Sequence, residues 1–207
     1  SLETASDILS AEIMIGMGLR ISEVVSLSMS SFPTLSEYKE RPSSRILRVT
    51  GKGNKTRSVP IPAELIKKVW RYADVERKLL LRKTNESAKH LLLQSSQGKI
   101  RPLAIRSLQK RFRQASLYSG ISGITAHILR HHFAAFYLMD EWAREKVFSD
   151  ILPSGDREAL ISRSVLRLSK ILGHVSWKTT LKYLDALAYF HLSEWNADFS
   201  DYLDGDK

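Results

Sequence analysis

Residues 124–133 read ITAHILRHHF and hold three of the six histidines in a chain of 207 residues. Thr125 can cap a helix that begins before His127, because a threonine oxygen accepts hydrogen bonds from the first backbone N–H groups of a helix. On such a helix Arg130 and His131 follow His127 by three and four positions, so the three side chains share one face. The stretch therefore predicts a helix with a cationic, hydrogen-bonding face.

Two kinds of site use a face of this composition. A hydrolytic zinc site has histidines at i and i+4, but it needs a glutamate directly after the first histidine, where this chain has Ile128. The chain also has no cysteine and no evident third ligand nearby, so no metal site is expected. His127 and Arg130 instead suit an oxyanion, because a guanidinium offers a planar fork of donors and an imidazole adds an N–H. One of His131 and His132 is expected to pack or to contact the backbone, and neither is assigned a catalytic role.

Upstream, residues 45–62 read RILRVTGKGNKTRSVPIP and predict a β-hairpin. β-Branched residues flank a glycine-rich turn, and two prolines close the second extended run. Lys52 and Lys55 then lie at the hairpin tip.

Helical periodicity covers most of the remaining chain. Apolar residues recur at helical spacing over residues 6–17, and a break at Gly18 places Arg20 at the junction with a second short helix. Further elements are expected as helices at 63–83, 103–118 and 157–172, a helix capped by Ser176 that carries Tyr183, and a short strand at 90–94. The sequence therefore predicts an α+β fold that is mainly α-helical, with a small antiparallel sheet.

The charge is unevenly distributed along the chain, which has a net charge of +10. Residues 39–116 contain 21 Lys and Arg against 5 Asp and Glu, whereas residues 184–207 contain six acids and one lysine. Clustered cations suit a polyanion such as DNA or RNA, although a well-solvated surface is the alternative. The helix at 103–118 places basic side chains opposite its apolar face, and these can meet phosphates or solvent.

The composition also narrows the class of protein. No run approaches the roughly 18 apolar residues of a membrane span, and no signal peptide is evident. The lack of cysteine excludes disulfides and fits a reducing compartment. We expect a cytoplasmic protein, associated with the nucleoid when bound to DNA, with no membrane partner.

Four blocks of the sequence resemble the tyrosine recombinase (phage integrase) family. They are GLRISEVVSL at 18–27, GKGNKTRSVPIP at 51–62, HILRHHFA at 127–134 and LGHVSWKTTLKY at 172–183, and they occur in the family's order. The resemblance implies the tyrosine recombinase catalytic-domain fold over residues 1–207, with a hairpin or small sheet at one edge. It also implies that the family's N-terminal core-binding domain is absent from this sequence.

The resemblance implies a role for each matched residue. The catalytic set would be Arg20, Lys52, His127, Arg130, His174 and the nucleophile Tyr183, with Glu23 supporting the site. These residues would cut and rejoin DNA through a 3′-phosphotyrosine link, without metal, ATP or other cofactor. DNA contacts are expected from the basic side chains Lys55, Arg57, Arg106, Lys110, Arg111 and Arg113, and Lys55 is the second candidate for the role of Lys52.

The same resemblance sets expectations for assembly and biology. A homo-oligomer on double-stranded DNA, a tetramer in the synapse, would recombine a specific core site, for integration or transposition of a mobile element. Residues 139–160 look like an insertion that lengthens two helices or contacts a neighbouring subunit. The acidic tail at 184–207 would pack on a neighbouring protomer or fold back on its own.

Three other classes remain open from the sequence. A type IB topoisomerase or a telomere-resolving enzyme would use the same tyrosine chemistry. A non-catalytic DNA-binding protein could use the same fold, but the complete catalytic set argues against it. An RNA-binding or structural protein that is basic for other reasons is disfavoured by the four-block match.

Overall fold

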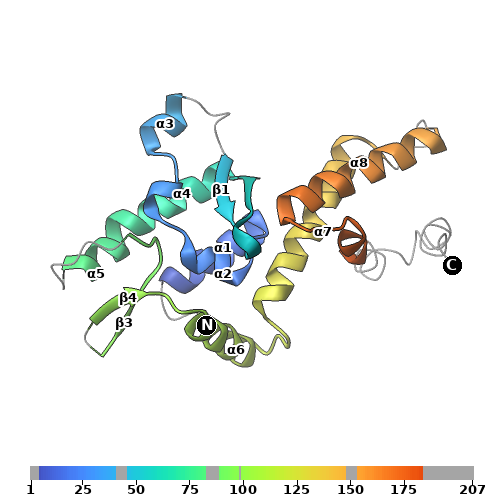
Figure 1. The fold of residues 1–207 in the computed structure, drawn as a ribbon. Helices are drawn as coiled ribbons and strands as arrows, with labels where there is room; N and C mark the ends of the chain where they lie inside the picture. Colours follow the sequence, from blue (N-terminus) through green and yellow to red (C-terminus); the bar gives the residue numbers. More distant parts are fainter. Residues whose placement is uncertain (1–4, 41–45, 83–88, 98, 148–152, 184–207) are drawn as a thin grey trace. The chain divides into compact units, whose positions relative to one another are not determined.

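Helices make up most of this computed structural model, which describes residues 5–40, 46–82, 89–97, 99–147 and 153–183, with the backbone alone described at Lys52 (Figure 1). The chain divides into two compact units, Ser1–Phe133 and Ala134–Lys207. The expected class is confirmed: an α+β fold, mainly helical, with small antiparallel sheets. None of the described helices is long and apolar enough to cross a membrane.

The first unit is built around α1. Its helices are α1 (Ala5–Met17), α2 (Ile21–Ser26), α3 (Leu35–Glu40), α4 (Ala63–Tyr72), α5 (Lys78–Arg82), α6 (Ile105–Ser119) and the start of α7 (Ala126–Arg144), with short helical turns η1 (Met29–Ser31), η2 (Lys52–Asn54) and η3 (Ala73–Arg77). The helix α1 packs against α2 and α4, and α2 packs against α6 (Figure 1). Leu9, Ile13 and Met17 are buried because their spacing places them on one side of α1.

The break after α1 is a glycine turn, as the sequence predicted. Gly18 has φ +63°, a backbone conformation that glycine adopts without steric cost. A Cβ atom at this position would lie within 3.0 Å of three carbons of the Phe133 ring. Both the backbone and the neighbouring ring therefore require glycine here, and the turn leads directly into Arg20, the N-cap of α2.

Two hairpins complete the first unit. The expected hairpin is confirmed: β1 (Ile46–Thr50) pairs antiparallel with β2 (Thr56–Pro60), from Thr50 opposite Thr56 to Ile46 opposite Pro60. The strand expected at 90–94 starts later, as β3 (Leu93–Ser96). It pairs with β4 (Lys99–Pro102), a strand that the sequence analysis missed because KIRP has only one apolar residue. The helix expected at 63–83 contains a π-helical turn, η3, between α4 and α5.

The second unit contains the rest of α7, then α8 (Ser154–Leu172), and a short helical segment over residues 178–183. The indole N–H of Trp142 on α7 donates to Ser164 Oγ on α8 over 2.7 Å, and both residues are buried. Gly173 ends α8 with φ +67°, as expected for a C-cap.

The segment expected as an insertion, 139–160, is helical at both ends in its described part. It supplies the last turns of α7 and the first turns of α8. The acidic tail at 184–207 lies outside the described residues.

Candidate active site

A buried carboxylate orients the first of the predicted arginines. Glu23 on α2 is 2% exposed, and its Oε2 accepts the backbone N–H of Arg20 over 2.8 Å. Its Oε1 accepts Arg20 Nη1 over 3.1 Å. The Arg20 side chain remains 36% exposed, so it is anchored at one side and accessible at the other. Glu23 thus holds Arg20 at the start of α2.

The same carboxylate binds Arg57, a contact that the sequence analysis did not predict. Arg57 was expected to contact DNA, but its Nη1 and Nη2 donate to Glu23 Oε1 and Oε2 over 2.7 and 2.8 Å. Burial by itself would raise the pKa of Glu23, but the hydrogen bonds from Arg57 and from the Arg20 backbone, with the charges of both arginines, hold that pKa below its ordinary value. Glu23 is therefore a carboxylate shared by two guanidinium groups.

The second predicted arginine is anchored at the turn that carries the first. Arg130 on α7 is 4% exposed, and its Nη1 donates to the carbonyl oxygen of Gly18 over 2.6 Å. Gly18 lies two residues before Arg20, although Arg130 is 112 positions away in the sequence. The fold thus brings the two arginines to one turn.

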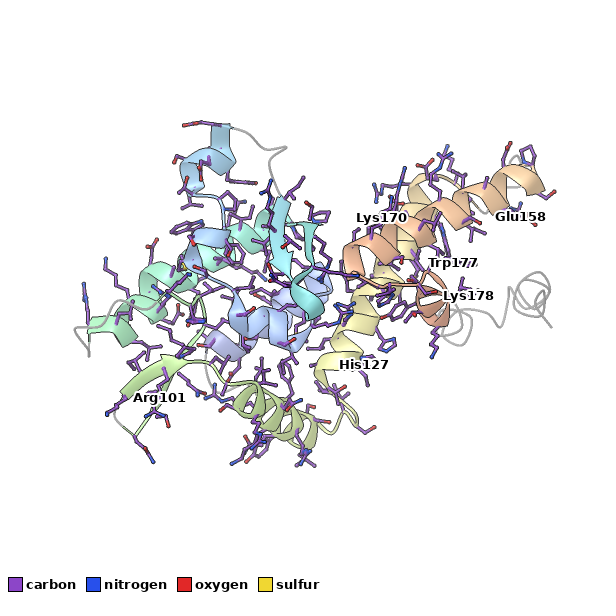
Figure 2. All side chains as sticks on the ribbon, viewed as in Figure 1. Arg101, His127, Glu158, Lys170, Trp177 and Lys178 are labelled. Carbon is purple, nitrogen blue, oxygen red and sulfur yellow. The ribbon has the colours of Figure 1, made fainter. Side chains whose placement is uncertain are left out.

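The predicted histidine of α7 lies beside another histidine. His127 sits at the start of α7 (Figure 2), and its Nε2 lies 2.5 Å from Nε2 of His131. One of the two nitrogens must donate and the other accept, so the pair shares one proton at this contact. Burial, together with the charges of His127 and Arg130, lowers the pKa of His131 below its ordinary value. Sequence analysis assigned His131 no catalytic role, although its i+4 spacing from His127 was visible.

The two lysine candidates lie at the tip of the first hairpin, as expected. Lys52 begins η2, between β1 and β2, and Lys55 follows this turn with an exposed side chain. The backbone N–H of Gly51 donates to the carbonyl oxygen of Lys55 over 2.9 Å and closes the tip. The hairpin position that the family match gives to Lys52 is therefore present.

Three of the four basic residues expected on α6 are exposed: Arg106, Lys110 and Arg113. Arg111 is only partly exposed: its Nη1 donates to Asp7 Oδ1 over 2.6 Å, and the Asp7 side chain is 0% exposed. The Arg111 guanidinium thus ties α6 to α1 instead of forming part of the outer basic face.

In the second unit, the predicted nucleophile stacks on the predicted histidine. The rings of His174 and Tyr183 have centroids 5.9 Å apart and an interplanar angle of 10°, and Tyr183 is 4% exposed. His174 Nδ1 lies 2.8 Å from the hydroxyl oxygen of buried Thr180, a contact that fixes the imidazole and directs Nε2 away from it. Ser176 caps the short helix, as expected, through the N–H of Lys178, which Figure 2 labels. No pattern in the sequence pointed to Thr180.

Each unit therefore has a distinct chemical capacity. The first presents two anchored guanidinium groups and an imidazole, which together can bind a phosphate through charge-assisted hydrogen bonds. The second presents a phenol next to an oriented imidazole. Within the described part of the chain, no group of three His, Asp or Glu side chains is arranged to hold a metal ion.

This fold is found in solved recombinases. A XerH site-specific recombinase bound to palindromic difH substrate has a TM-score of 0.59 at 21% identity, over 91% of this chain and 43% of that one. A XerA recombinase has the same TM-score and identity, over 91% of this chain and 57% of that one. The Tn1549 transposon integrase, solved with a circular intermediate DNA, has a TM-score of 0.53 at 17% identity, over 86% of this chain and 52% of that one. The fold is that of tyrosine recombinase catalytic domains.

Sequence comparison adds the family. The profile of the Phage integrase family matches residues 2–148. Tyrosine recombinase XerC of Agrobacterium fabrum is 32% identical over 171 residues, 83% of this chain and 43% of that protein. XerC of Alcanivorax borkumensis is 31% identical over 184 residues, which are 88% of this chain and 48% of that protein. The chain belongs to the phage integrase family, and it spans about half the length of these relatives.

Proposed function

We propose that this chain is the catalytic domain of a site-specific DNA recombinase, an enzyme that cuts and rejoins DNA strands for a mobile element. The observation that carries the proposal is the anchoring of Arg20 and Arg130 at the Gly18 turn, in a chain of the phage integrase family. Two guanidinium groups brought together from distant segments suit the doubly charged transition state of phosphoryl transfer.

In the proposed reaction the phenol oxygen of Tyr183 attacks the scissile phosphorus. The new O–P bond forms as the bond from phosphorus to the 5′ oxygen breaks, which leaves a 3′-phosphotyrosyl link and a 5′ hydroxyl. Arg20 and Arg130 hold the non-bridging oxygens, while His127 and His174 add hydrogen bonds.

Protons must move at both ends of this step. A tyrosine hydroxyl has an ordinary pKa near 10, so its proton has to be removed or shared as attack proceeds. Lys52 donates a proton to the departing 5′ oxygen, and a general acid of this kind commonly contributes roughly 10² to 10⁴ in rate. Because the phosphotyrosyl link retains the phosphodiester bond energy, a 5′ hydroxyl of the partner strand can reverse the step without ATP, metal or other cofactor.

The partner in this proposal is double-stranded DNA with a specific core site. The exposed cations on α6 and at the hairpin tip, Arg106, Lys110, Arg113 and Lys55, would contact its phosphates. Relatives of the same fold support this partner, since XerH was solved with its difH substrate and the Tn1549 integrase with transposon DNA. The latter also supports a mobile element. Recombination would take place in a homo-oligomer, a tetramer in the synapse, with residues 139–160 and 184–207 as candidate contacts between protomers.

The test is formation of a covalent adduct. The protein is incubated with a pool of duplexes whose core sequence is randomised and whose strand is nicked, so that a short flank diffuses away after cleavage. We expect an adduct that survives boiling in SDS, and sequencing of the attached DNA then gives the core site. Tyr183→Phe should bind the same DNA and form no adduct; an adduct formed by this variant would remove Tyr183 from its role.

A salt titration tests the DNA contacts. Binding to the recovered site should weaken steeply with salt, because phosphate contacts release counterions. Removal of one exposed cation by Lys110→Ala should reduce the salt slope by about one. Relaxation of supercoiled plasmid without strand exchange between two sites would instead indicate a topoisomerase.

A further inference from the structure

The hairpin that carries Lys52 is tied to α2 by a buried ion pair. Arg57 lies on β2 opposite Val49, next to the strand pair that leads into the tip. Its side chain is 12% exposed and faces Glu23 with both terminal nitrogens, at 2.7 and 2.8 Å. A two-point contact of this kind fixes the orientation of the guanidinium as well as its distance. The position of β2 relative to α2 is therefore set by a side chain close to the tip.

The carboxylate at the other end of this pair also orients Arg20. Glu23 accepts Arg20 Nη1 over 3.1 Å and the Arg20 backbone N–H over 2.8 Å. One buried carboxylate thus contacts both the strand below Lys52 and the arginine that is proposed to hold the phosphate. A displacement of Arg57 therefore changes the distance between the strand below Lys52 and Arg20.

The backbone at the base of the tip passes close to the same carboxylate. A Cβ atom on Gly51 would be 2.8 Å from Glu23 Oε1 and 3.3 Å from Arg57 Nη1, so only glycine allows this approach. Gly51 directly precedes Lys52, and its N–H donates to the carbonyl oxygen of Lys55 across the tip. The Arg57 ion pair therefore holds the strand next to the tip on Glu23, and the lack of a side chain at Gly51 lets the start of the tip lie close to the same carboxylate.

We propose that Arg57 is a positioning residue for the general acid: through Glu23 it holds the hairpin so that Lys52 reaches the departing 5′ oxygen of the phosphate bound by Arg20. Gly51 serves the same purpose by allowing the tip to approach the carboxylate. The inference rests on the proposed function and assigns Arg57 a role in proton transfer, in place of the DNA contact that its charge suggested.

The test compares two leaving groups at the cleaved bond. The core-site duplex is made with either oxygen or sulfur at the bridging 5′ position of the scissile phosphate. A thiolate leaves without a proton, since a thiol is far more acidic than an alcohol, so the sulfur duplex does not need the general acid. Single-turnover cleavage rates are measured for the wild type and for Lys52→Ala and Arg57→Gln variants.

We expect Lys52→Ala to cleave the oxygen duplex about 10² to 10⁴ times more slowly and to recover on the sulfur duplex. Arg57→Gln should cleave the oxygen duplex about 10- to 100-fold more slowly, the size of effect that follows a misplacement of about 1 Å. On the sulfur duplex it should recover most of this loss of rate. Gly51→Ala should show the same selective recovery. Arg57→Lys keeps the charge but offers one contact in place of two, so it should fold normally and show a smaller loss with the same selectivity.

The matched control is Arg111→Gln. It breaks a similar pair, between a guanidinium and the buried Asp7, but one that joins α6 to α1 and not the hairpin to α2. Its loss of rate, caused by lower stability, should be equal on the two duplexes.

The outcomes separate the inference from the proposed function. The inference would be overturned if Arg57→Gln and Arg57→Lys lost cleavage rate equally on both duplexes, or if neither variant lost any. The proposed function would stand in that case, because the wild type still cleaves. Failure of Lys52→Ala to recover on sulfur would overturn both the acid role of Lys52 and the role of Arg57. No cleavage of either duplex by the wild type would refute the proposed function itself.

Discussion

Replacement of Gly18 by alanine is predicted to be costly for two separable reasons. The first is the backbone, because a left-handed conformation costs an alanine about 1–2 kcal/mol, and Gly18 has φ +63°. The second is the Phe133 ring, which lies within 3.0 Å of the new Cβ, and overpacking of this kind costs about 1–3 kcal/mol. The sum is about 2–5 kcal/mol, a large share of a typical stability of about 5–15 kcal/mol.

The prediction is tested by urea unfolding against a matched variant. Gly120 also has a left-handed φ, +68°, but no atom lies within 4 Å of a Cβ built there, so Gly120→Ala should lose only the backbone part. Adding Phe133→Leu to Gly18→Ala should restore much of the steric part. Gly18→Ala should also cleave DNA more than tenfold more slowly, because the Gly18 carbonyl anchors Arg130. Equal destabilisation by the two glycine substitutions would refute the role of the ring.

Two further predictions concern the histidines. Thr180→Val removes the hydroxyl that orients His174 and should slow adduct formation about tenfold or more. Thr180→Ser keeps a hydroxyl and should retain most of the rate. Equal rates in the two variants would show that the hydroxyl is not needed. The pKa of His131 is lowered in the folded state by burial and by the neighbouring charges of His127 and Arg130, so the unfolded state binds more protons just below pH 6.5. The free energy of unfolding should therefore be highest above that pH and should decrease as the pH falls towards the lower folded-state pKa. The urea midpoint of His131→Gln should depend less on pH over the same range.

Local signals in the sequence were sufficient for most of the secondary structure. The Gly18 break, the hairpin and the Gly173 C-cap were predicted, because each depends on the residue itself or on its near neighbours in the chain. The strand β4 was missed because its pairing with β3, and not its own composition, makes it a strand. Its polar sequence has little intrinsic preference for an extended conformation.

The positions of the basic residues could not be predicted in the same way. Arg57 and Arg111 lie in the segment with a large excess of cations, so both were assigned to DNA. Their partners, Glu23 and Asp7, lie outside that segment and 34 and 104 positions away. A charge count along the chain cannot reveal such a partner, because the pairing depends on the packing of α2 against the hairpin and of α1 against α6. The same applies to the contact between Arg130 and the Gly18 carbonyl.

In the short segment from His174 to Tyr183 the two functional rings stack on each other, and the imidazole of His174 also contacts the Thr180 hydroxyl. In the proposed enzyme, whatever shifts this segment withdraws the nucleophile and a phosphate-binding imidazole in a single movement. A displacement confined to these residues would therefore stop cleavage without changing the contacts that anchor Arg20 and Arg130.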